Sequence, residues 1–203
     1  MPTHTIDRDE FLKDVKAHAI LVLRSNGAER HIRFKNPASS CYWFDLLTWP
    51  GALCIDGDCG TYVFKRTPDM FEFFRDGRGT INPAYWSEKV VSVSSTHDVK
   101  EFCEASFVQH AVETYRDYWR GTGRFADQRE GFELLRDTVL GATSLAEMHS
   151  VLYDFEWRGF QFHDTWEWDP TRFSRSFLWN LHAIVWGIQQ FDALAGQQQV
   201  AAA

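Results

Sequence analysis

The sequence predicts an α+β fold, with an N-terminal antiparallel sheet of hairpins packed against a C-terminal set of helices. Residues 1–66 hold five short apolar runs separated by turn signals, and residues 67–196 hold longer runs with helical spacing. Strands and helices do not alternate along the chain, as they would in a parallel sheet. We therefore expect a single α+β domain over residues 1–196, sheet-rich over 1–66 and helical over 67–196, with residues 197–203 as a frayed tail.

The first helix is predicted from its start signals. Asp7 can cap the helix, and Glu10 completes a capping box three residues later. Ile6 and Phe11 have the spacing of a hydrophobic staple, which fixes the angle at which the chain enters the helix.

A hairpin is predicted next, over residues 19–34. Asn26 and Gly27 favour a tight type I′ turn between two apolar runs. This turn sets a register in which Arg24 lies directly opposite Glu29, and opposite charges facing each other across two strands support that register.

Residues 41–48 form the third predicted strand, and a second hairpin follows it. Its turn is expected at Asp56 and Gly57, another dipeptide typical of two-residue turns. In that register Cys54 faces Cys59 at a pair where side chains come close together. The sequence leaves two interpretations of this pair open: two small buried thiols, or a disulfide bridge that forms and breaks with the redox state.

The remaining elements are predicted as helices. Thr67 before Pro68, and Asn82 before Pro83, each place a capping residue ahead of a proline at the first helical position. Longer helices are expected at residues 98–119, 127–140, 144–159 and 169–196.

Charge and composition exclude several classes of protein. The net charge is −7 and the 21 Lys and Arg residues are scattered, whereas readout of duplex DNA needs a basic stripe. No apolar run approaches the roughly 18 residues of a membrane span, and the polar start does not resemble a signal peptide. We expect a cytoplasmic protein without membrane contact. The four cysteines lack zinc-type spacing, so neither a metal nor a cofactor is expected.

Three segments, 41–75, 81–89 and 178–193, resemble a family of uncharacterised accessory proteins of tailed phages and prophages. They read CYWFDLLTWPGALCIDGDCGTYVFKRTPDMFEFFR, INPAYWSEK and LWNLHAIVWGIQQFDA. The resemblance spans roughly residues 30–195, and the first segment is its most distinctive part. The family has no established activity, so no catalytic residue is carried over. The resemblance implies an accessory phage protein in the cytoplasm of a bacterial host cell, where such proteins often bind host proteins.

One set of candidate binding residues lies in the predicted sheet. The aromatic residues Trp43, Trp49 and Tyr62 occur near the basic residues Lys65 and Arg66. Exposed rings beside a basic groove can stack on the bases of single-stranded nucleic acid, which is one alternative function. The same rings would equally serve as the core of a small sheet.

A second set lies in the aromatic segment 156–168. Trp157 and Trp166 alternate there with acidic residues that include Asp164. Exposed aromatic rings rimmed by charge are typical of protein-binding surfaces. The chain has nine Trp and seventeen Phe residues, more than a core of this size ordinarily uses.

A small metal-dependent hydrolase or nucleotide-processing enzyme is the other alternative. Asp56 and Asp58 lie two residues apart, and His163 precedes Asp164, so either pair could supply acid, base or metal ligands. A metal site would need further ligands to converge on His163, for which the candidates are His110, His149 and Asp169.

The leading hypothesis is an acidic, non-enzymatic accessory protein that binds a bacterial host protein or nucleoprotein. It rests on the negative charge, the surplus of aromatic residues and the lack of a complete catalytic motif. An inhibitor of host defence is one such role, and a homodimer is compatible with it.

Overall fold

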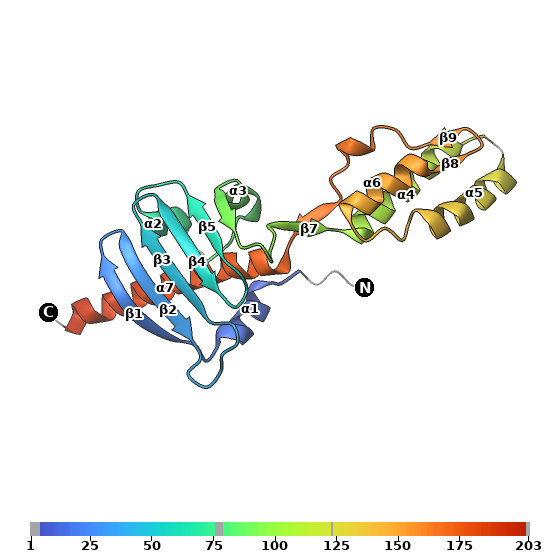
Figure 1. Ribbon diagram of the computed structural model, residues 1–203. Coiled ribbons are helices and arrows are strands. Elements are labelled where there is room, and N and C mark those ends of the chain that lie inside the picture. Colours follow the sequence, from blue (N-terminus) through green and yellow to red (C-terminus); the bar gives the residue numbers. More distant parts are fainter. Residues whose placement is uncertain (1–4, 76–78, 123, 202–203) are drawn as a thin grey trace. The chain divides into compact units, whose positions relative to one another are not determined.

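The computed structural model describes residues 5–75, 79–122 and 124–201, and it confirms the α+β fold (Figure 1). The chain divides into two compact units. Unit 1 comprises Met1–Val99 and Phe173–Ala203, and unit 2 comprises Lys100–Arg172. Each unit has its own hydrophobic core, and every residue of each core belongs to that unit.

Unit 1 is built on a six-stranded antiparallel sheet with the strand order β1-β2-β3-β4-β5-β6. The strands are β1 (Ala19–Asn26), β2 (Glu29–Lys35), β3 (Phe44–Trp49), β4 (Ala52–Gly57), β5 (Tyr62–Lys65) and β6 (Val90–Val93). The helices of this unit are α1 (Arg8–Val15), α2 (Met70–Phe74), α3 (Pro83–Ser87) and α7 (Arg175–Ala201).

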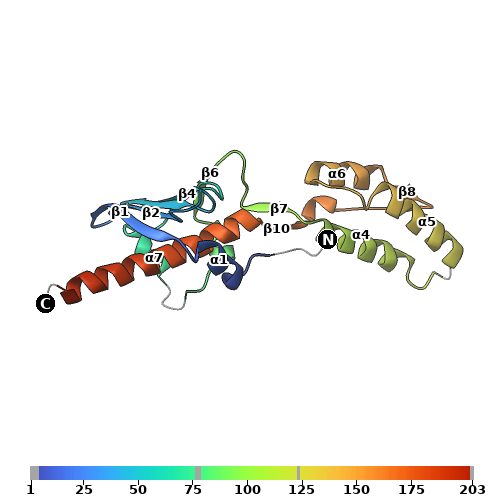
Figure 2. The same cartoon turned by 90° about the horizontal axis from the view of Figure 1, so that it is seen from below.

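Helices α1 and α7 lie on one face of the sheet (Figure 2). The core between them is largely aromatic: Phe34 and Phe44 stack at 4.7 Å, and Trp186 of α7 packs edge-on against both rings. Gly187 lets α7 approach closely, because a Cβ there would lie 2.9 Å from Cδ1 of Leu46. On the opposite face, Leu21 and Trp49 are 55% and 42% exposed.

Unit 2 is mostly helical (Figure 1). Its helices are α4 (Glu104–Trp119), α5 (Phe125–Thr138), α6 (Leu145–Asp154) and the short 3₁₀ helix η1 (Thr165–Glu167). Its strands are β7 (Lys100–Phe102), β8 (Glu156–Trp157), β9 (Phe160–Gln161) and β10 (Thr171–Phe173), the last of which ends in unit 1. The core includes Tyr115, whose ring packs edge-on against Phe160 at 5.2 Å.

Three predicted helix starts are confirmed. The side chain of Asp7 accepts a hydrogen bond from the backbone N–H of Glu10 at 2.8 Å, and Asn82 caps α3 ahead of its first-turn proline. Ser144 accepts from the N–H of Glu147 at 3.2 Å. These caps are predictable because the donor and acceptor are three residues apart in the sequence.

The predicted register of the first hairpin is wrong. Asn26 pairs with Glu29, so the loop residues are Gly27 and Ala28, and Gly27 has the positive φ of +57° that the first loop position requires. A bulge near residue 23 shifts the pairing again, so Arg24 lies opposite His31. Arg24 and Glu29 still form an ion pair, but diagonally across the two strands.

The second predicted turn is also wrong. Asp56 and Gly57 belong to β4, where they pair with Asp45 and Phe44 of β3. Gly57 is needed there for a close approach of the two strands, since a Cβ would lie 2.2 Å from the carbonyl oxygen of Trp43. The chain therefore turns later, beyond Gly57.

The later turn separates the two cysteines that were expected to face each other. Cys54 pairs with Val63, and all four cysteines are free thiols. Burial raises the pKa of Cys54 to about 11 and that of Cys59 to about 12, which keeps both thiols protonated at neutral pH. Of the two interpretations given for these cysteines, the structure agrees with two separate, partly buried thiols.

Several predicted helix bounds need correction. Asp69, not Thr67, caps α2, and residues 100–102 form a strand, so α4 begins six residues later than expected. The third long helix ends at Asp154, and a hairpin replaces its predicted last turn.

The start and end of the last helix were also misplaced. Pro170 precedes strand β10 instead of opening a helix, and Ser174 caps α7 by accepting from the N–H of Phe177 at 3.2 Å. Gly196 does not end α7, which continues to Ala201. The apolar stripe of this helix is buried: Phe177, Leu181, Ile184, Val185 and Ile188.

Candidate functional site

The sheet does not bring its predicted binding residues together. Tyr62 is fully buried beneath the helices, and its hydroxyl lies 3.1 Å from that of Ser176. Trp43 packs against the guanidinium of Arg33, 5.6 Å from the ring centre. Trp49 is partly exposed. The three aromatic rings therefore do not form one stacking platform.

The two predicted basic residues of this site, Lys65 and Arg66, are both exposed. Lys65 pairs with Ala52, which also pairs with Trp49, so these side chains share one face of the sheet. Of the predicted nucleobase-binding residues, Trp49 and Lys65 thus lie on the same face.

Asp56 and Asp58 have structural partners. Asp56 accepts a hydrogen bond from the hydroxyl of Thr61 at 2.5 Å. Asp58 accepts from the backbone N–H of Tyr42 at 2.8 Å, and Tyr42 has an unusual φ of +61° for a residue other than glycine. Asp56 thus binds a side chain just before β5, and Asp58 holds the backbone just before β3.

His163 and Asp164 are exposed residues that precede η1. Asp164 has a φ of +56° at the turn into this helix. His110 lies on α4, where its ring stacks on Trp168 at 5.6 Å. In the part of the chain that the structure describes, no three His, Cys, Asp or Glu side chains come together as ligands for a metal ion.

A network of charged side chains lies on the helix-free face of the sheet in unit 1. Asp45, which is buried, accepts two hydrogen bonds from Arg33 and one from His31, each at 2.8 Å. Burial alone would raise the pKa of Asp45, but these hydrogen bonds outweigh it and hold the pKa below the usual value. The charged groups of the network thus bind one another, so we assign the network to stabilisation of the sheet and not to a binding site.

The negative charge of the protein is concentrated in unit 2. Unit 2 has fourteen Asp and Glu residues against eight Lys and Arg, a formal charge of −6, whereas unit 1 carries −1. The field around unit 2 therefore attracts positively charged groups more strongly than that around unit 1.

A groove between α5 and α6 combines this charge with apolar surface. We call it the α5–α6 groove; its volume is about 340 Å³, and it is lined by Leu134, Thr138, Val151, Asp154, Phe155 and Glu156. Among the described residues, neither Asp154 nor Glu156 forms an ion pair, although Glu156 accepts a hydrogen bond from the amide of Gln161. Tyr153, which directly precedes the lining residue Asp154, is 89% exposed.

The predicted aromatic segment 156–168 is partly a surface and partly core. Trp166 is 73% exposed on η1, which contacts α6. Trp157 is partly buried, and its indole N–H donates to the carbonyl of Asp127 at 2.9 Å, which fastens β8 to the first turn of α5. The segment therefore contributes one exposed ring, Trp166, between the acidic residues Asp164 and Glu167.

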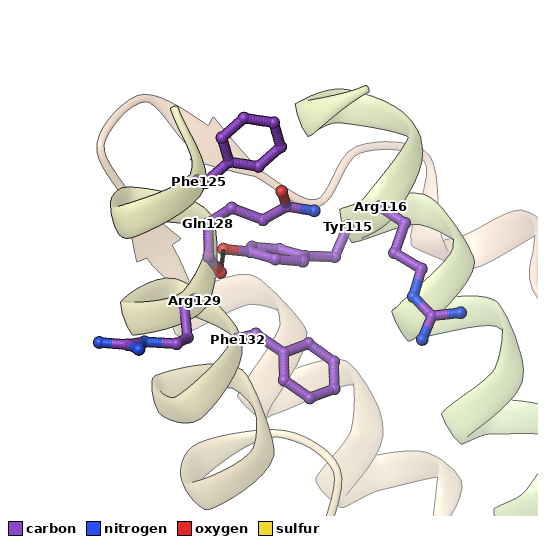
Figure 3. A pocket seen from close by; sticks show the side chains of 6 residues that line it. All are labelled: Tyr115, Arg116, Phe125, Gln128, Arg129 and Phe132. Carbon is purple, nitrogen blue, oxygen red and sulfur yellow. Dashed lines mark hydrogen bonds between the residues drawn. The ribbon is translucent and has the colours of Figure 1, made fainter. Parts of the chain in front are cut away.

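A second hollow lies between α4 and α5 (Figure 3). We call it the α4–α5 hollow; its volume is about 250 Å³, and it is lined by Tyr115, Arg116, Phe125, Gln128, Arg129 and Phe132. The hydroxyl of Tyr115 donates to the carbonyl of Gln128 at 2.8 Å, which holds the two helices together. Gly131 makes this contact sterically feasible, because a Cβ there would lie 2.3 Å from the Tyr115 hydroxyl.

Neither Tyr153 nor the two hollows was predicted from the sequence. The segment Tyr153–Trp157, YDFEW, does alternate aromatic and acidic residues, a signal that could have placed it with the predicted patch. The hollows could not have been found, since they depend on how successive helices pack against each other, which no local sequence pattern specifies.

Comparison of this chain with protein-family models, with curated proteins and with solved structures finds no match. Over residues 5–75, 79–122 and 124–201, every helix is too short or too polar to cross a membrane.

Proposed function

We propose that the protein binds a basic bacterial protein through unit 2, with the α5–α6 groove as the contact that selects positive charge. The observation that carries this proposal is a groove lined by apolar side chains and by two carboxylates, Asp154 and Glu156, that form no ion pair among the described residues. A lysine or arginine side chain fits such a site, because its aliphatic stem packs on apolar surface while its charged end meets a carboxylate.

Exposed aromatic residues support the same role. Tyr153 adjoins the groove and Trp166 lies on η1, and both are largely exposed. Tyrosine and tryptophan are enriched among the residues that contribute most to binding at protein interfaces. The resemblance to phage accessory proteins supports a partner from a bacterial host, and inhibition of a host defence protein is one form that this role takes.

The proposal is tested by capture from a bacterial lysate with the full-length chain as bait. We expect the wild type to retain a basic protein that is released at high salt, since screening weakens exposed charge pairs. The double variant Asp154→Asn, Glu156→Gln should retain at most one-tenth of the partner that the wild type retains. A tenfold loss of affinity corresponds to about 1.4 kcal/mol of binding free energy.

A matched control separates the groove from overall charge. Glu104→Gln with Glu113→Gln removes the same number of charges from exposed positions on α4. This control should retain the partner. The proposal fails if no protein is captured, or if both double variants release the partner equally.

A further inference from the structure

Two arginines of unit 2 differ from its other basic residues. Six of the eight Lys and Arg residues of this unit form ion pairs with Asp or Glu: Lys100, Arg120, Arg124, Arg136, Arg158 and Arg172. Among the described residues, Arg116 and Arg129 form none. Unpaired arginines are unexpected in a unit with fourteen acidic residues, and both line the α4–α5 hollow.

The surface between these two arginines is aromatic. Phe125 is 79% exposed, and Tyr115 and Phe132 form the wall beneath it. Figure 3 shows the rings of Phe125, Tyr115 and Phe132 one below another, with Arg116 on the α4 side and with the guanidinium of Arg129 pointing outward from α5. A group that packs on the rings thus has Arg116 at the α4 edge of the hollow, and Arg129 is the second basic residue that lines it.

The start of α5 adds to the local positive potential. The helix begins at Phe125 without a side-chain cap, and the acidic residue of its first turn, Asp127, is already paired with Arg124 and Arg158. The N-terminal end of a helix carries a partial positive charge, which favours an anion nearby. The hollow is therefore a positive spot on an otherwise negative unit.

We propose that the α4–α5 hollow binds a small aromatic anion, a planar ring that carries a phosphate or a carboxylate group. The ring packs against Phe125 and Phe132, and the anionic group binds Arg116 or Arg129, since guanidinium groups pair well with both phosphate and carboxylate. The volume of about 250 Å³ lies just below the range of roughly 300–1,000 Å³ for typical ligand pockets, so the ligand is small. The charge of −6 on unit 2 disfavours a long polyanion such as nucleic acid.

Titration calorimetry with the full-length protein tests this site. The probes are adenosine monophosphate, which carries a phosphate, and indole-3-acetate, which carries a carboxylate. The controls are adenosine, which lacks the anionic group, and inorganic phosphate, which lacks the aromatic ring. We expect at least one aromatic anion to bind at least tenfold more tightly than either control. The preferred probe then identifies the anionic group.

Variants show whether binding occurs in the hollow. Arg116→Gln with Arg129→Gln should weaken the bound probe at least tenfold, and Phe125→Ala should weaken it by a similar factor. Arg136→Gln is the matched control, an exposed arginine on the same helix that is paired with Asp137, and it should leave the affinity unchanged. The proposal is overturned if neither aromatic anion binds, or if the double arginine variant binds as tightly as the wild type.

Discussion

Asp45 illustrates how a single side chain can be charged and buried at once. It lies on the helix-free face of the sheet, where Arg33 and His31 cover it and supply three hydrogen bonds. Both partners remain partly exposed, so solvent screens their charges and keeps the net stabilisation moderate. The contribution of these hydrogen bonds to the free energy of unfolding therefore depends on Asp45 being ionised.

This dependence predicts a pH effect on stability. Because the pKa of folded Asp45 is lowered, its contribution is present above the unfolded pKa of about 3.9 and is lost as the pH falls through the folded value. Asp45→Asn should lower the free energy of unfolding by about 1–3 kcal/mol at pH 7. The difference from the wild type should shrink below about pH 4 in urea titrations.

Glu29→Gln serves as the control for this prediction, because Glu29 forms only an exposed ion pair with Arg24. Its effect should stay within about 0.5 kcal/mol at every pH. A deficit of Asp45→Asn that persists unchanged at pH 3 would show that the charge of Asp45 contributes nothing.

At the residue scale, what could be predicted was local. The caps Asp7, Asn82 and Ser144 were predicted because each acts on a backbone group within three residues. The sequence left open whether Tyr62 is buried or exposed, because this depends on which face of the strand the tyrosine occupies. That choice follows from a hairpin whose turn was misplaced.

At the element scale, the packing of α5 depends on one glycine. A Cβ at Gly131 would lie 2.3 Å from both the Tyr115 hydroxyl and Cδ1 of Trp157. These two side chains donate hydrogen bonds to successive carbonyls of α5, those of Asp127 and Gln128. The helix is therefore held in place at its first turn.

Gly131→Ala should consequently destabilise unit 2. Overpacking costs about 1–3 kcal/mol, which exceeds the gain of about 1 kcal/mol from replacing glycine in a helix. Gly196→Ala is the control: it also lies in a helix, but no atom lies within 4 Å of its Cβ, so it should stabilise the protein by up to about 1 kcal/mol. Thermal unfolding of both variants measures the difference, and equal effects would refute this role of Gly131.

Strand pairing was the least predictable feature at this scale. Asp56 and Gly57 have the composition of a tight turn, yet Gly57 is required because β3 passes close to it. The composition of a dipeptide does not distinguish these two uses of glycine. The short strands β6, β8 and β9 were missed, because runs of two to four residues carry little periodic signal.

At the scale of the whole molecule, the two units are linked by two crossings of the chain. Unit 1 is completed by a segment that begins at Phe173, more than seventy residues after Val99. The backbone N–H of Ser174 donates to the carbonyl of Val99 at 3.0 Å, so the two ends of unit 1 are adjacent. Local sequence patterns do not reveal such a return, although the fold class was predicted correctly.

This arrangement predicts that unit 1 folds without unit 2. Replacing Lys100–Arg172 with a flexible linker of about four residues keeps every member of the unit 1 core and joins ends that are already neighbours. We expect a single cooperative thermal transition and a sheet-rich circular dichroism spectrum. A chain that melts without a cooperative transition would contradict the division into two units.

The central claim is that unit 2 binds a basic partner protein, and the same deletion tests it most directly. The measurement is the amount of bacterial protein retained by the full-length chain and by the folded chain that lacks Lys100–Arg172, at equal bait and low salt. The account predicts a salt-sensitive partner on the full-length chain and none on the shortened one. Equal retention of that partner by both chains would contradict it.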